Sequence, residues 1–200
     1  MNRQIRIEHL ISFADAIFAF SITFMAISIQ IPNSSQNLTQ TQLINRLLEL
    51  SPQFEIYVIS FFVIGIYWIS YHQVFNYIPG SHPILAWLTL VFLFFITLIS
   101  FATDLQIVYG SYRVVFVLYA SVLTLAGSIL TLIWLHATKN RLIDNSLSKT
   151  EIQNISLQSI IPPSVFAISI LVSFIDLQIA NYFWMVIIPA EIIIHKKYPQ

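Results

Sequence analysis

One carboxylate stands alone in the first long apolar segment of the sequence. Across residues 9–31, Asp15 is the only Asp, Glu, Lys or Arg. A charged side chain in the hydrocarbon core of a membrane costs about 3 kcal/mol or more, so it should face protein or water rather than lipid. A carboxylate accepts hydrogen bonds and can exchange a proton with a nearby imidazole. Asp15 is therefore the first candidate for a functional side chain.

His72 and Trp68 are the donors that could reach this carboxylate. Asp15 lies about six residues into its segment, which at 1.5 Å per residue places it roughly 9 Å inside the inner boundary. The second apolar segment runs back inward and ends near Ile78, so His72 has nearly the same depth and Trp68 lies one turn deeper. The spacing predicts a buried hydrogen-bond cluster. Two roles stay open: fastening the first helix to the second, or relaying or sensing protons through His72.

The first segment also carries an apolar stripe that includes one hydroxyl. At 100° per residue, five side chains share a sector about 100° wide. They are Phe20, Thr23, Phe24, Ile27 and Ile31. Asp15 points roughly 140° away from Phe20. If the stripe faces a pore, the carboxylate faces back into its own subunit and anchors the helix. The alternative is ordinary helix packing, with Thr23 bonded to a carbonyl of its own helix.

The composition requires a membrane around the segments that carry these residues. Of the 200 residues, 57% are hydrophobic and 9% are charged, whereas soluble domains carry about 25% charged residues. The formal net charge of zero argues against nucleic acid as a partner, and the absence of Cys excludes disulfides and thiolate metal sites. Lipid is therefore the expected solvent for most of the chain.

Six segments approach the roughly 20 apolar residues that a spanning helix needs. They cover about 9–31, 55–78, 84–103, 113–137, 158–175 and 177–194. The predicted fold class is an all-α membrane protein, with residues 1–200 forming a single domain of six transmembrane helices. Pro162 and Pro163 suit a helix entry, and Pro189 should kink the last helix. Leucines and an isoleucine at helical spacing over residues 43–50 predict a short amphipathic helix at the membrane surface.

The distribution of Lys and Arg predicts the orientation. With the N-terminus inside, seven basic residues fall on the inner side and two on the outer side, and basic residues favour the cytoplasm. The inner ones are Arg3, Arg6, Lys139, Arg141, Lys149, Lys196 and Lys197, and the outer ones are Arg46 and Arg113. Both termini are therefore expected in the cytoplasm.

Several segments resemble a known family of channels. FADAIFAFSIT at residues 13–23 resembles the first helix of transmembrane-protein-175-type potassium channels, whose signature is Arg-x-x-x-Phe-Ser-Asp. GIYWISYH at 65–72, LFFIT at 93–97 and IPP at 161–163 resemble later helices of that family. The resemblance extends over all six predicted spans in order. His9 stands at the signature Arg position and Ala14 at the Ser position.

The resemblance implies a specific assembly and function. One-repeat prokaryotic members form tetramers in which the first helix lines the pore, so this chain should be a homotetramer in a prokaryotic plasma membrane that conducts K⁺ without a cofactor. Its pore constriction would comprise Phe20, Thr23, Phe24 and Ile27, with no Thr-Val-Gly-Tyr-Gly carbonyl filter. An inner hydrogen-bond network would comprise His9, Phe13, Asp15, Trp68 and His72, which the changes at 9 and 14 could weaken or make pH-sensitive.

Three other classes of function compete with a channel. A proton-coupled secondary transporter, or a proton-conducting channel, would use Asp15 and His72 as titrating groups, but such transporters usually contain internal repeats and broken helices. A membrane enzyme is not expected, because no span carries a metal-binding cluster or a nucleophile motif. A structural or assembly protein would need no polar site at all, and composition alone does not exclude it.

Overall fold

The described residues of this protein, taken from a computed structural model, are 6–27, 29, 39–80, 82–144, 146–187 and 189–190. In these ranges the regular structure is helical. The helices are α1 (Ile7–Ile27), α2 (Gln40–Glu49), α3 (Ser51–Asn76), α4 (Pro83–Tyr109), α5 (Arg113–Lys139), α6 (Lys149–Val172), α7 (Leu177–Phe183) and the 3-10 turn η1 (Trp184–Val186). The predicted all-helical fold is therefore confirmed for this part of the chain.

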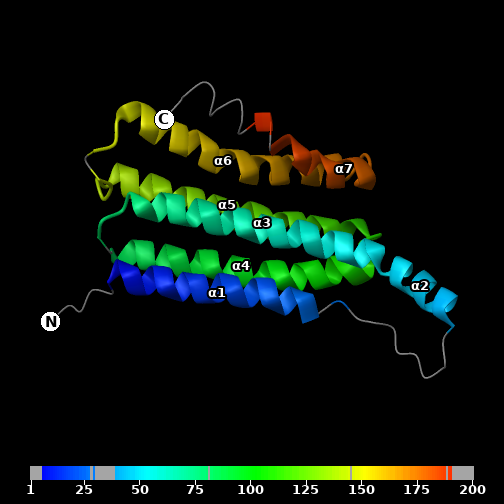
Figure 1. The fold of residues 1–200 in the computed structure, drawn as a ribbon. Helices are drawn as coiled ribbons and strands as arrows, with labels where there is room; N and C mark the ends of the chain where they lie inside the picture. Colours follow the sequence, from blue (N-terminus) through cyan, green and yellow to red (C-terminus); the bar gives the residue numbers. More distant parts are fainter. Residues whose placement is uncertain are drawn as a thin grey trace.

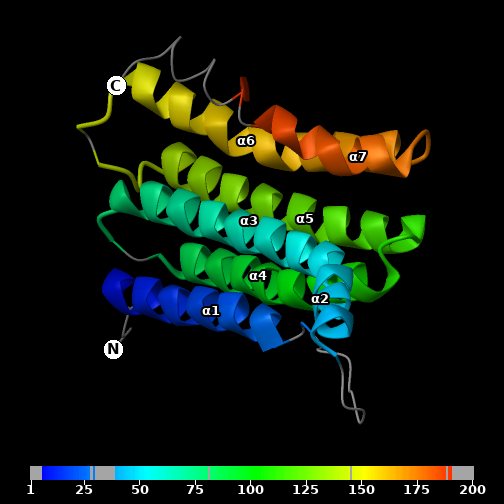
Figure 2. The same ribbon diagram turned by 45° about the vertical axis from the view of Figure 1, so that its right-hand side comes forward.

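The long helices form a layered bundle. Figures 1 and 2 show α1 along one edge, α4 next to it, α3 and α5 in the middle, and α6 with α7 along the opposite edge. α4 contacts α1, α3 and α5, which places it at the centre of the packing. Aromatic rings fill the space between α1, α3 and α4: Tyr71 stacks on Phe92 at 5.7 Å, and Phe18 lies 6.1 Å from Tyr71. This packing fixes which face of α1 remains free.

Among the described residues, five helices are long and apolar enough to cross a membrane, and each overlaps one of the first five predicted spans. The predicted sixth span, 177–194, is not confirmed. Helix α7 has only seven residues and is followed by the three-residue turn η1, and residues 191–194 lie outside the described ranges. A 3-10 turn tightens the backbone here just before Pro189, which has no N–H for a regular helical bond.

The prediction that Pro162 and Pro163 lie at a helix entry was wrong. Helix α6 begins at Lys149, because Ser148 and Glu151 form a capping box in which each side chain accepts the other residue's backbone N–H. Pro162 and Pro163 consequently lie inside the helix. The membrane boundary of the fifth span, predicted near residue 158, stays a prediction.

A hydroxyl from α5 compensates for Pro163. Proline has no N–H, so Pro163 leaves the carbonyl of Ser159, four residues earlier, without its helical donor. The Thr131 hydroxyl donates to this carbonyl at 2.6 Å. In a lipid environment an unpaired carbonyl is costly, and helices with internal proline rely on such neighbouring donors. Thr131 therefore joins α5 to α6 at the proline pair.

We expect Thr131→Val to destabilise the protein by about 1 kcal/mol, since the Ser159 carbonyl loses its donor while the side-chain shape is kept. Thr124→Val is the matched control, because the Thr124 hydroxyl donates only to Ala120 of its own helix. The measurement is thermal unfolding in mild detergent. Equal melting temperatures for the two variants would contradict the role given to Thr131.

Buried hydroxyls also join α3, α4 and α5. Thr103 donates to Ser60 at 3.0 Å, and Ser60 lies 2.8 Å from the Tyr119 hydroxyl. The Tyr67 hydroxyl donates to the carbonyl of Leu123 at 2.6 Å. All of these side chains are buried. Such bonds between helices in lipid are worth about 0.6 kcal/mol each on average, and they fix the register of the three helices.

The predicted amphipathic helix is confirmed as α2. Thr39 and Gln42 form its capping box, and its apolar side chains are exposed: Leu43, Ile44, Leu47 and Leu48. Figure 1 shows α2 beyond the end of the bundle, joined directly to α3. Its location at a membrane surface stays a prediction.

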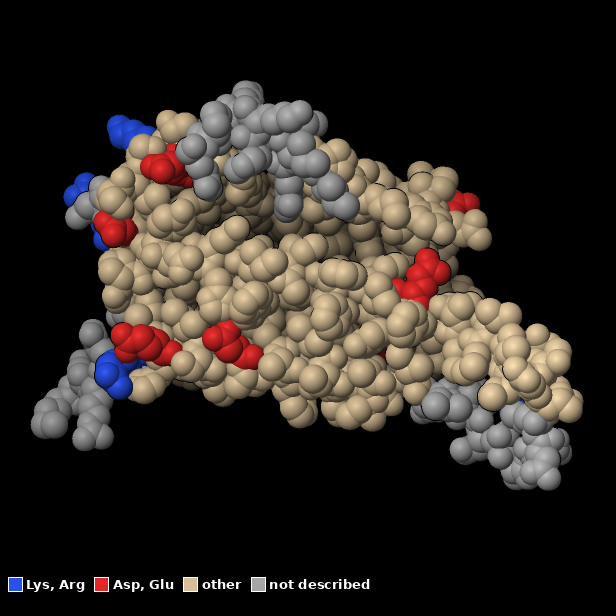
Figure 3. All heavy atoms as spheres, in the orientation of Figure 1, with Lys and Arg blue, Asp and Glu red and all other residues tan. Residues whose placement is uncertain are grey.

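Charged side chains concentrate at the two ends of the bundle. Figure 3 shows a surface largely free of charge between the ends, with Lys and Arg gathered at the left, where α1 and α6 begin and α5 ends. The basic residues of those segments are Arg6, Lys139, Arg141 and Lys149. Arg46 and Arg113 belong to α2 and the start of α5, at the opposite end (Figure 1). Arg3, Lys196 and Lys197 lie outside the described residues.

Candidate pore-lining site

Helix α1 has one packed face and one free face. Its buried residues recur at intervals of three or four positions, as one face of a helix requires. They are Leu10, Ala14, Phe18, Ser21 and Met25. This face contacts α4 and α3. Glu8 in the first turn favours the start of the helix, because a carboxylate there offsets the partial positive charge of the helix terminus.

The predicted stripe lies on the free face. Phe20 is 62% exposed and Ile27 is 76% exposed, and Phe24 and Thr23 are exposed as well. The rings of Phe20 and Phe24 stack with their centroids 5.7 Å apart. Ile31 lies outside the described residues. The side chains of Phe20, Thr23, Phe24 and Ile27 are therefore not part of the packed core of one chain. They are free to contact lipid or other copies of the chain.

The Thr23 hydroxyl is bonded to its own helix. It donates to the carbonyl of Ala19 at 2.9 Å or to that of Phe20 at 3.0 Å. This is the own-helix bond that the sequence left open as an alternative. Since the single hydroxyl proton is used inside the helix, the remaining lone pairs of the oxygen are available on the exposed side. An oxygen with free lone pairs is a suitable ligand for a cation.

A row of small residues runs beside the stripe on the same free face. Ala16, Ala19, Thr23 and Ala26 are all exposed and follow each other at spacings of three, four and three. At 100° per residue, the centre of this row lies roughly 90° around the helix from the centre of Phe20, Phe24 and Ile27, but Ala16 lies only about 20° from Ile27, so the row overlaps the stripe. Small residues allow close approach of a neighbouring helix in a membrane. The spacing is visible in the sequence, but the three alanines did not enter the sequence-based prediction.

The predicted hydrogen-bond cluster forms between Asp15 on α1 and Trp68 and His72 on α3. The indole N–H of Trp68 donates to Asp15 Oδ1 at 2.8 Å, and His72 Nε2 lies 2.8 Å from the same oxygen. The Trp68 and His72 rings are 4.7 Å apart in an edge-on arrangement. The cluster is less buried than predicted: the side chains of Asp15 and His72 are 44% and 30% exposed. The cluster joins α1 to α3 and is partly open to its surroundings.

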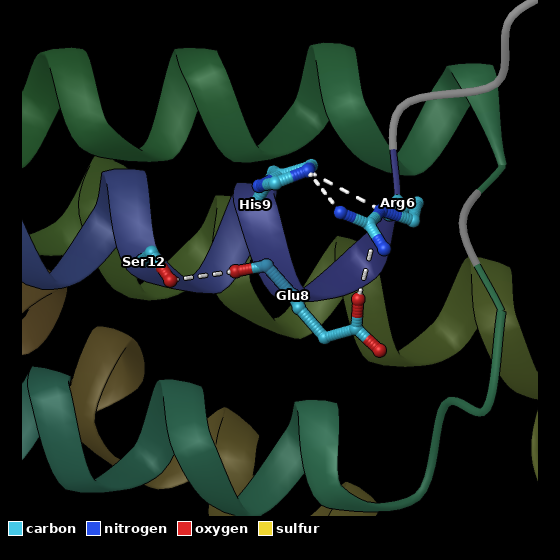
Figure 4. A network of polar contacts seen from close by, with 4 residues as sticks. All are labelled: Arg6, Glu8, His9 and Ser12. Atoms are coloured by element: carbon cyan, nitrogen blue, oxygen red, sulfur yellow. Dashed lines mark hydrogen bonds and ion pairs between the residues drawn. The ribbon is translucent and has the colours of Figure 1, made fainter.

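His9 and Phe13 make separate contacts. Figure 4 shows the Arg6 guanidinium directed at His9 and Glu8, with Arg6 Nη2 2.9 Å from His9 Nε2 and Arg6 Nε 4.0 Å from Glu8 Oε2. Phe13 is exposed, and Ala14, at the position of the family's serine, is fully buried with no polar side-chain atom. The expected network of five residues therefore divides into the Asp15 cluster and an Arg6–His9 contact at the start of α1.

Residues with metal-binding side chains do not gather elsewhere in the described ranges. No group of three or more His, Asp or Glu residues there could hold a metal ion. The stripe and the Asp15 cluster are thus the two features of this part of the chain that carry an arrangement suited to ions or protons.

Comparison with known proteins places these features in a family context. The model of the family described as endosomal/lysosomal potassium channel TMEM175 matches residues 9–99, which include the stripe and the Asp15 cluster. A potassium channel of Chamaesiphon minutus is 26% identical over 175 residues, covering 84% of this chain and 85% of that protein. A potassium channel of Streptomyces collinus is 29% identical over 143 residues, covering 70% and 66% of the two chains.

Solved structures share the arrangement of helices. The crystal structure of a lysosomal potassium-selective channel TMEM175 homolog from Chamaesiphon minutus matches with a TM-score of 0.79 and 21% identity, over 96% of this chain and 98% of that one. A single-substitution variant of the potassium channel MtTMEM175, crystallised with a nanobody fusion protein, matches with a TM-score of 0.67 and 17% identity, over 98% and 94% of the chains. At these identities the matches establish a common fold.

Proposed function

We propose that this chain is a potassium-permeable channel of the TMEM175 type in which α1 lines the pore, because the family model matches residues 9–99 and a similar protein named a potassium channel is 26% identical over 84% of the chain. One observation carries the proposal: the free face of α1 presents three large apolar side chains and one hydroxyl that its own subunit leaves uncovered. A helix at the edge of the bundle, as in Figures 1 and 2, is placed to meet other copies.

The two rows on the free face support a ring of identical subunits. In a cyclic assembly, one side of each subunit meets the other side of its neighbour, so the two contacting surfaces differ and must be complementary. The free face of α1 carries both small side chains, Ala16, Ala19 and Ala26, and large apolar ones, so it offers two different surfaces to neighbouring copies. We propose a homotetramer, as the resemblance to one-repeat prokaryotic members of the family implies.

The proposed conduction path combines an apolar constriction with a ring of hydroxyls. Phe20, Phe24 and Ile27 would form apolar rings that close the pore by excluding water, and Thr23 would contribute four oxygens that replace part of the ion's water shell. No carbonyl filter of the Thr-Val-Gly-Tyr-Gly type occurs in the sequence. K⁺ selectivity would therefore depend on the width of this constriction and on Thr23.

Residues 1–200 would form one channel domain with six spans. Both termini would lie in the cytoplasm of a prokaryotic cell, as the distribution of basic residues favours.

The Asp15 cluster would fasten α1 to α3, because its two hydrogen bonds are made within its own subunit. The cluster would then lie beside the pore-lining face rather than on it.

The experiment that tests the function is a flux measurement on purified protein in liposomes. We expect K⁺ to enter faster than Na⁺, and a protonophore to accelerate the K⁺ flux, because H⁺ that leaves through the protonophore balances the charge that K⁺ carries through a channel. A flux that stops without a pH gradient would favour the second candidate, proton-coupled transport through Asp15 and His72, since these groups are in contact and partly exposed. Equal fluxes of the two ions would contradict K⁺ selectivity.

A further inference from the structure

A second polar contact holds α1 at the middle of its length. The hydroxyl of Ser100 on α4 donates to the backbone carbonyl of Ser21 at 2.9 Å. Both residues are buried, with 4% and 1% of their surface exposed. Ser21 lies six residues after Asp15, which corresponds to roughly 9 Å along the helix. Helix α1 is therefore attached by hydrogen bonds to α3 near its start and to α4 farther along.

The Ser100 contact lies behind the proposed constriction. Ser21 comes directly after Phe20 and two residues before Thr23. At 100° per residue, it points roughly 160° away from Thr23, and the two differ in height by about 3 Å. The hydroxyl of α4 thus meets the back of α1 at the level where the front carries the Thr23 oxygen.

The geometry of this bond constrains both the height and the rotation of α1. The acceptor is a backbone atom, so it cannot follow the donor by a change of side-chain rotamer. Sliding α1 by one residue would move the carbonyl by about 1.5 Å along the axis and about 100° around it, which breaks the bond. Without this bond the Ser100 hydroxyl could donate only to a carbonyl of its own helix, as Thr97 does on α4, and it would then no longer join α4 to α1. The side-chain oxygen of Ser21 has no hydrogen-bond partner, so the contact depends on the carbonyl.

The rest of the stripe has no comparable attachment. Within the part of the chain that the structure describes, no side chain of another helix hydrogen-bonds to α1 between Ile22 and Ile27. Met25 is buried there, but its contacts are apolar and non-directional. The position of Thr23, Phe24 and Ile27 relative to α4 therefore depends strongly on the bond at Ser21.

We propose that Ser100 is a positioning residue for ion selectivity: through the Ser21 carbonyl it sets the height and rotation at which α1 presents the Thr23 hydroxyl to the pore. This inference rests on the proposed channel function. Ser100 itself does not touch the ion, and it acts only through the backbone of α1.

The test compares Ser100→Ala with Thr103→Val. Both remove a buried hydroxyl of α4 that contacts another helix, but the Thr103 hydroxyl lies 3.0 Å from Ser60 on α3 and 2.8 Å from the Ile99 carbonyl of its own helix. We expect Ser100→Ala to lower the K⁺/Na⁺ permeability ratio in liposomes by roughly threefold, which corresponds to about 0.16 kcal/mol from each of four subunits. Thr103→Val should lower the melting temperature similarly and leave the ratio unchanged. In a Thr23→Ala background, Ser100→Ala should have no additional effect on the ratio.

The role of Ser100 and the channel function of the protein are contradicted by different results. A wild-type protein without K⁺ preference would contradict the proposed function. A selective wild type with an unchanged ratio in Ser100→Ala, or with the same change in Thr103→Val, would overturn only the role of Ser100. If Ser100→Ala does not fold, Ser100→Cys keeps the volume and a weak donor. A ratio between those of wild type and Thr23→Ala is then expected, and a wild-type ratio would overturn the inference.

Discussion

Thr23→Ala should lower the K⁺/Na⁺ permeability ratio by about tenfold, because the four subunits together lose every hydroxyl of the constriction. A tenfold change is about 1.4 kcal/mol, so each of the four hydroxyls needs to favour K⁺ over Na⁺ by only about 0.35 kcal/mol. The hydroxyl uses its proton within α1 and so presents an oxygen with free lone pairs on the exposed face. Helix stability should change little, because alanine is a good helix former. The measurement is the ratio of K⁺ and Na⁺ fluxes into liposomes.

Thr138→Ala is the control for this prediction. Thr138 is half-buried and also donates to a carbonyl of its own helix, at 3.0 Å, but it lies in the last turn of α5. Its removal should leave the flux ratio at the wild-type value. If Thr23→Ala keeps the wild-type ratio, Thr23 has no part in selectivity, and the apolar rings alone would have to account for it.

Ile27→Ala should raise the resting K⁺ leak by about tenfold, because each subunit then loses three carbon atoms from the apolar ring. A tenfold rise requires the barrier to ion passage to fall by only about 0.35 kcal/mol per subunit. A wider and less apolar ring is easier to wet, and a wetted pore conducts. Ile27 is 76% exposed within one chain, so the substitution creates no cavity inside the subunit. The protein should fold and assemble as the wild type does.

Leu171→Ala is the matched control for the leak. Leu171 is another large apolar side chain with 68% of its surface exposed, but it belongs to α6 at the opposite edge of the bundle (Figure 1). Its leak should equal that of the wild type. An equal rise in both variants would indicate general loosening of the protein in the membrane instead of a gate at Ile27.

The sequence predicted those features that depend on length, depth and helical periodicity. The five long helices follow from apolar runs of sufficient length, and the Asp15–Trp68–His72 contact follows from a fixed rise per residue in two antiparallel helices. The exposed stripe of α1 follows from a rotation of 100° per residue. These quantities are constants of helix geometry, so they could be used without knowledge of the packing.

The features that the sequence did not predict depend on contacts between specific neighbours. The exposure of Asp15 depends on how far α3 covers α1, which periodicity does not determine. The Ser159 carbonyl, which Pro163 leaves without its helical donor, accepts a hydrogen bond from Thr131 of another helix. The acceptor of the Ser100–Ser21 hydrogen bond is a backbone carbonyl. Every residue has one, so the residue types do not indicate which carbonyl accepts the bond. Pairs of this kind become visible only when the helices are placed side by side.

Accessibility of residue 23 to water tests the central claim most directly. The chain contains no Cys, so Thr23→Cys introduces a single thiol into an unaltered background. Its K⁺ flux in liposomes should be blocked by a small thiol-reactive cation applied from the aqueous phase, whereas Leu171→Cys should be unaffected. A Thr23→Cys channel that conducts K⁺ and is insensitive to the reagent would contradict a pore lined by this face of α1.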